Sequence, residues 1–95
     1  MTQDEKALLE NVLDSLDRLF DHESTVIDVY ALLFATSKAL VGSNFHPHIE
    51  PLVGRLRAIV RTQRHEESRR DAALVATDDL RKVLAASLPK PTLKG

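Results

Sequence analysis

Residues 26–40, VIDVYALLFATSKAL, decide the fold of this chain. Placed at about 100° per residue, their apolar side chains cover more than half of a helix circumference. A helix that is apolar over so wide an arc contacts two or more neighbours, so we expect the central helix of a bundle. The run is too short to span a bilayer. The remaining seam is small or polar and consists of Asp28, Ala31, Ala35, Lys38 and Ala39.

The preceding sequence predicts one amphipathic helix, from Thr2 to about Asp21. Thr2 and Glu5 have the spacing of a capping box, in which each side chain accepts the other residue's backbone N–H. Ser24 or Thr25 is expected to cap the next helix. The apolar stripe of the first helix has helical spacing and comprises Leu9, Val12, Leu13, Leu16, Leu19 and Phe20.

A third helix is expected after residue 42. Gly42 is predicted to end the second helix at the C′ position, where a left-handed residue is common. The third helix is expected to begin between Pro47 and Pro51, because proline is tolerated in a first turn and costly later. Gly54 lies inside this helix and is expected to allow a close helix crossing.

A fourth helix is expected to close before Pro89. The polar run 61–70 either breaks the third helix or continues it, and Ser68 is a candidate cap for the fourth. The sequence therefore predicts an all-α fold, a four-helix bundle or a closely related small helical bundle. We expect a single domain over residues 1–88 and a short flexible tail over residues 89–95. The apolar positions of the fourth helix are Ala73, Leu74, Ala76, Leu80, Val83 and Leu84.

Composition narrows the classes of function. Of 95 residues, 43% are apolar and 28% charged, which is typical of a folded globular domain. There is no cysteine, so neither a disulfide nor a thiolate metal site can form. The acidic start MTQDEKALLE is unlike a signal peptide, and we therefore expect a cytoplasmic protein without a membrane anchor.

Charge is divided unevenly along the chain. Residues 1–30 contain eight acidic and two basic residues, whereas residues 31–95 contain six acidic and eleven basic residues. If the helices keep these charges in solvent, the molecule has an acidic side and a basic side.

The first helix carries a column of carboxylates. Their spacing of four, three and four residues places them on one face, away from the apolar stripe. Arg18 is the one basic neighbour that we expect there. A solvated outer face and a docking surface for a basic protein both fit the pattern, and the unrelieved repulsion favours docking. The column and its extension across the loop comprise Glu10, Asp14, Asp17, Asp21, Glu23 and Asp28.

Two other polar clusters are weaker candidates. Arg57, Arg61 and Arg64 could contact phosphate, but acidic residues follow them and no aromatic residue is interleaved for base stacking. His46, His48 and Glu50 would need a further metal ligand from elsewhere in the chain. No residue set combines a nucleophile with a base and an orienting group. We therefore expect no catalysis, no cofactor and no metal.

The chain has a recognisable general plan over residues 2–87. An acidic first helix is followed by the loop His22-Glu23-Ser24-Thr25 and then by the opening of the apolar helix, Val26-Ile27-Asp28-Val29-Tyr30. This plan resembles the small all-helical immunity proteins of bacterial contact-dependent inhibition and colicin D-type toxin systems. The resemblance implies a non-catalytic inhibitor that covers the active site of a cognate toxin, a basic nuclease domain, with carboxylates in place of phosphates. The net charge of −1 differs from the strongly acidic balance common among nuclease inhibitors.

Two alternatives use other surfaces. A homo-oligomeric assembly protein would pack the small seam Ala31, Ala35 and Ala39 against a second copy. A regulatory nucleic-acid-binding protein would use the three arginines of the third helix, although nucleic acid is the less favoured partner. A dimer at micromolar concentration would indicate the first alternative, and salt-sensitive retention on DNA or RNA the second.

Overall fold

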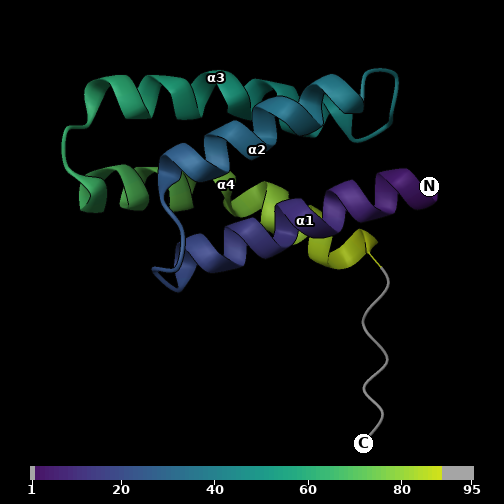
Figure 1. Cartoon of the computed structure of the whole chain (residues 1–95), viewed down its shortest axis with the longest axis horizontal. Coiled ribbons are helices and arrows are strands. Elements are labelled where there is room, and N and C mark those ends of the chain that lie inside the picture. Colours follow the sequence, from purple (N-terminus) through teal and green to yellow (C-terminus); the bar gives the residue numbers. More distant parts are fainter. Residues whose placement is uncertain (1, 89–95) are drawn as a thin grey trace, which may run out of the picture.

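The computed structural model describes residues 2–88 as four helices joined by short connections. Consecutive helices run in opposite directions (Figure 1). Each helix packs against the next, α4 returns to α1, and α2 also touches α4 across the bundle. The expected all-α helical bundle is therefore confirmed, and the expected tail, residues 89–95, lies outside the described residues. The helices are α1 (Gln3–Phe20), α2 (Val26–Ala39), α3 (His46–Thr62) and α4 (Glu66–Ser87).

Capping boxes begin the first two helices. Thr2 Oγ1 accepts the N–H of Glu5 at 3.1 Å, and Glu5 Oε1 accepts the N–H of Thr2 at 3.1 Å. Thr25 and Asp28 repeat this arrangement at the start of α2, with distances of 3.2 and 3.4 Å. The prediction for α1 is confirmed, and Thr25 rather than Ser24 caps α2.

The end of α2 differs from the prediction by one residue. The buried Leu40 is the C-cap, so Gly42 is the second residue after it and not the C′ residue. Gly42 has φ +90°, and the turn around it is closed by the N–H of Ser43 donating to the Leu40 carbonyl at 2.8 Å. The helix thus ends one residue earlier than predicted, and Gly42 is the left-handed residue of the turn that follows it.

Two expectations for α3 are wrong. The helix begins at His46, and Pro51 lies inside it. Pro51 has no N–H for the Pro47 carbonyl, but both residues are exposed, so water can solvate that carbonyl. An added Cβ at Gly54 would meet nothing within 4 Å, so Gly54 makes no close helix crossing and instead borders open space.

The polar run 61–70 contains a short turn between two helices. α3 ends at Thr62, and α4 begins at Glu66 with His65 as its cap, so the predicted cap at Ser68 is wrong. The side chain of Glu66 reaches α2, where its Oε2 accepts the N–H of Val26 at 3.2 Å. The start of α4 is therefore bonded to the start of α2.

The core confirms α2 as the central helix, because α2 contacts α1, α3 and α4. Its seam of small and polar residues is exposed, as expected. Phe34 and Val41, which the wide apolar arc placed against neighbours, are 41% and 72% exposed, because the three neighbours cover only part of the circumference. The largest fully buried apolar side chains are Leu9, Leu16, Leu19, Leu33, Leu40, Ile49, Leu56 and Leu84.

Thr36 carries a buried hydroxyl without a hydrogen-bond partner among residues 2–88. The buried Thr77, by contrast, donates its hydroxyl to the Ala73 carbonyl at 2.8 Å. We expect Thr36→Val to raise the free energy of unfolding by about 1 kcal/mol, because valine keeps the shape and removes an unsatisfied polar atom. Urea unfolding measures the change. Thr77→Val is the matched control and should bring no gain, and a loss of stability in Thr36→Val would contradict this assignment.

Candidate protein-binding surface

The acidic column occupies the outer face of α1, along its edge with α4. Because α1 is uninterrupted from Gln3 to Phe20, the spacing of four, three and four residues holds in the folded helix. We define the acidic surface as the six candidate residues Glu10, Asp14, Asp17, Asp21, Glu23 and Asp28, all of which are exposed except the half-buried Asp17.

Two members of the acidic surface form ion pairs. Arg18 Nε lies 3.3 Å from Asp14 Oδ2, and Arg81 Nε lies 2.9 Å from Asp17 Oδ1. Arg81 also stacks over the ring of Phe20, with its guanidinium carbon 5.3 Å from the ring centroid. The expectation that Arg18 is the one basic neighbour is therefore wrong, because α4 brings Arg81 against α1.

The other members of the acidic surface differ in whether their carboxylates are bonded to another residue of the chain. Glu10, Asp21 and Glu23 make no ion pair with any other residue between 2 and 88. Asp28 is exposed but serves the capping box of α2. The surface thus divides into three carboxylates without an internal ion pair, one in an exposed ion pair, one in a part-buried ion pair and one that caps a helix start.

A shallow hollow of about 260 Å³ extends the acidic surface at the loop end of the bundle. It is lined by residues 22–25 and Asp28, and on the other side by Glu66, Glu67 and Arg70 from α4. Arg70 Nη1 lies 3.2 Å from His22 Nδ1. Sequence reasoning missed the two glutamates because the boundary between α3 and α4 was open; their position in a first helical turn was the available signal.

The pKa shifts of Glu5 and Lys82 do not favour acid–base catalysis. Ser43 Oγ donates to Glu5 Oε2 at 2.7 Å, and this bond, with that from the Thr2 N–H, lowers the pKa of Glu5. The Asp78 carboxylate, 2.9 Å from Lys82 Nζ, raises the pKa of Lys82. Both shifts move the group further from neutral pH, whereas catalytic groups are usually shifted toward it.

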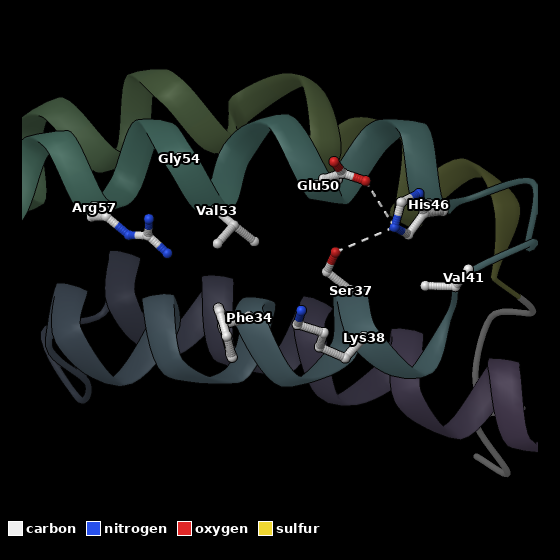
Figure 2. A pocket seen from close by; sticks show the side chains of 9 residues that line it. All are labelled: Phe34, Ser37, Lys38, Val41, His46, Glu50, Val53, Gly54 and Arg57. Carbon is white, nitrogen blue, oxygen red and sulfur yellow. Dashed lines mark hydrogen bonds and ion pairs between the residues drawn. The ribbon is translucent and has the colours of Figure 1, made fainter.

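The three metal candidates are not brought together. His46 Nε2 lies 3.0 Å from Glu50 Oε2 and 3.5 Å from Ser37 Oγ (Figure 2). His48 lines a different hollow, between α3 and α4. No group of three or more histidines, cysteines or acids among residues 2–88 is placed to hold a metal ion.

The arginines of α3 follow the edge that this helix shares with α2. Arg57 and Arg61, the arginine column, are exposed four residues apart on one face of α3. Arg64 is also exposed, but it follows the extended cap residue Gln63 outside the helix, so helical spacing does not align it with the other two. Arg57 Nε donates to the hydroxyl of Tyr30 on α2 at 3.2 Å, so the Arg57 side chain lies on the side of α3 that faces α2. Arg57 therefore lies at the α2–α3 edge of the bundle and Asp17 at the α1–α4 edge, and these two helix pairs lie on opposite sides (Figure 1).

Comparisons with protein-family models, with curated proteins and with solved structures return no match, so these surfaces are interpreted from their own geometry. No helix formed by residues 2–88 has both the length and the apolar content needed to cross a bilayer.

Proposed function

We propose that this chain is a non-catalytic, cytoplasmic inhibitor of the immunity type, which binds a protein toxin through the acidic surface. The observation that carries the proposal is the set of exposed carboxylates without an internal ion pair, Glu10, Asp21 and Glu23, on one side of the bundle. Successive carboxylates of the α1 column lie three or four residues apart and repel one another, and a basic partner relieves the repulsion.

The mechanism is occlusion. Residues 10–21 span about 16 Å along α1, a length over which several cationic side chains of a nuclease can be contacted at once. Asp14 can join this contact, because its ion pair with Arg18 is exposed and such pairs contribute little to folding. Asp17 lies in the same column but is half-buried beside Arg81. The carboxylates then take the places that substrate phosphates need, and the toxin is blocked without any chemistry by this chain.

Affinity capture tests the proposal directly. The tagged chain is recovered from its native cytoplasm at moderate salt, and bound proteins are identified by mass spectrometry. We expect stoichiometric recovery of one basic protein whose nuclease activity is inhibited by the purified chain. Recovery of a partner with no activity that the chain inhibits would contradict the immunity function. Salt-sensitive capture of nucleic acid alone would favour the arginine column instead.

A pair of charge reversals tests the surface. Glu10→Lys with Asp21→Lys should weaken toxin binding by about 100-fold, because both carboxylates face the partner and neither serves the fold. Titration calorimetry measures the affinity, and the melting temperature should hardly change. The matched control is Asp71→Lys with Asp79→Lys, which makes the same charge change on exposed positions of α4. Equal loss in both variants would show a general charge effect and contradict the assigned surface.

A further inference from the structure

The outer face of α2 and the turn that follows it carry an exposed apolar stripe that the proposed function does not use. Ile27, Phe34 and Val41 are 49%, 41% and 72% exposed, and they recur at intervals of seven residues. They are three of the five large apolar side chains exposed between residues 2 and 88. Ala31 lies between Ile27 and Phe34 on the same face, and Lys38 lies between Phe34 and Val41, with its Nζ 5.4 Å from the centroid of the Phe34 ring. A regular apolar stripe of this kind is typical of an interaction surface.

A groove runs beside this stripe, between α2 and α3, with a volume of about 540 Å³ (Figure 2). Phe34 and Val53 line its middle, where Gly54 leaves the α3 wall without a side chain. Charged groups lie toward the two ends of the groove. Arg57 lines one end and Glu50, whose side chain is 64% exposed, lies toward the other.

We propose that this face binds a second copy of the chain in a two-fold symmetric dimer, with α2 antiparallel to its own copy. A two-fold axis at the level of Phe34 places Ile27 opposite Val41 of the second copy, so apolar side chains meet along the whole stripe. The same reversal places Lys38 at the level of Tyr30 of the second copy, whose side chain carries no charge.

The charges of α3 select the same arrangement independently. Phe34, Val53 and Gly54 line the middle of one groove, so the axis that passes Phe34 also passes α3 near Val53 and Gly54. Reversal of α3 about that level places Glu50 opposite Arg57 of the second copy, and Arg57 opposite its Glu50. The face of one copy thus carries both members of the ion pair, and the two-fold axis forms the pair twice. A symmetric interface requires such self-complementary charges, whereas binding of an unrelated partner does not.

The stripe from residue 27 to residue 41 is about 21 Å long, which limits the contact to two helices of each copy. An interface of this size falls at the lower end of specific contacts, so we expect a dissociation constant on the order of 10 µM. The α1 part of the acidic surface, Glu10, Asp14, Asp17 and Asp21, lies on the opposite edge, where α1 meets α4, and stays open in this dimer. The dimer is therefore independent of toxin binding: a monomer that binds toxin would overturn this inference alone, and a dimer that binds none would overturn the proposed function alone.

Charge reversal and charge swap test the pairing. Sedimentation velocity of the full chain, from low micromolar to several hundred micromolar, should show a concentration-dependent monomer–dimer equilibrium. Glu50→Arg and Arg57→Glu should each weaken the dimer at least about 10-fold, because each places like charges opposite one another twice. The chain that carries both substitutions should recover dimerisation, since the pairs are restored with reversed sign.

Two further variants complete the test. Phe34→Ser removes the central apolar contact and should leave a monomer with unchanged helicity, because this side chain is exposed in the monomer. Arg55→Glu makes the same charge change on α3 but next to α4, and it should leave the dimer intact. A wild-type chain that stays monomeric at the highest concentration would overturn the proposal. So would a dimer that survives both single reversals, or a double variant that remains a monomer.

Discussion

Replacement of Leu33 by alanine is expected to lower the free energy of unfolding by about 3 kcal/mol and the melting temperature by roughly 15 °C. Leu33 is fully buried on α2, the helix that contacts all three others. The cavity left by its side chain is held open by several helices, so no single movement can close it and the cost stays high. Urea unfolding and thermal melts at low protein concentration, where the chain is monomeric, measure both changes.

Phe34 is the matched control for this prediction. It is the next residue along α2, its side chain is larger, and it is 41% exposed. Phe34→Ala should cost less than about 1 kcal/mol, because the side chain contacts few buried groups in the monomer. A ranking by side-chain size would reverse this order. Equal losses from the two substitutions would mean that the outer face of α2 is covered within the monomer.

Local signals were sufficient for the starts of α1 and α2 and for the fold class. The capping boxes of α1 and α2 each lie within four consecutive residues, so their hydrogen bonds depend on neighbours that the sequence displays directly. The wide apolar arc of α2 likewise required several neighbours, and the structure supplies three. These features could be predicted because the interacting groups are close in sequence or because one helix shows the requirement by itself.

Features that depend on how distant helices meet could not be predicted. Apolar pattern alone does not distinguish Leu33, which is buried, from Phe34, which borders a groove. The same holds for the acidic surface. Its spacing was readable from α1, but the ion pair with Arg81 depends on the register of α4 against α1, and no local signal encodes that register.

Replacement of Arg69 by alanine is expected to lower the free energy of unfolding by about 2 kcal/mol. Its guanidinium donates from Nε to the Gln63 carbonyl at 2.6 Å and from Nη2 to the Val60 carbonyl at 3.0 Å. These carbonyls lie at the C-terminal end of α3, where a helix leaves acceptors without an internal donor. Arg69 therefore fixes the turn between α3 and α4, and urea unfolding of the variant measures what that contact contributes.

Two variants separate geometry from charge in this turn. Arg64→Ala removes an exposed arginine next to Gln63 and should change the free energy of unfolding by less than about 0.5 kcal/mol. Arg69→Lys keeps the positive charge but replaces the planar fork with a single ammonium, so it should recover only part of the loss. Full recovery by lysine would mean that charge near the end of α3 is sufficient. Unchanged stability in Arg69→Ala would mean that water solvates both carbonyls as well as the guanidinium does.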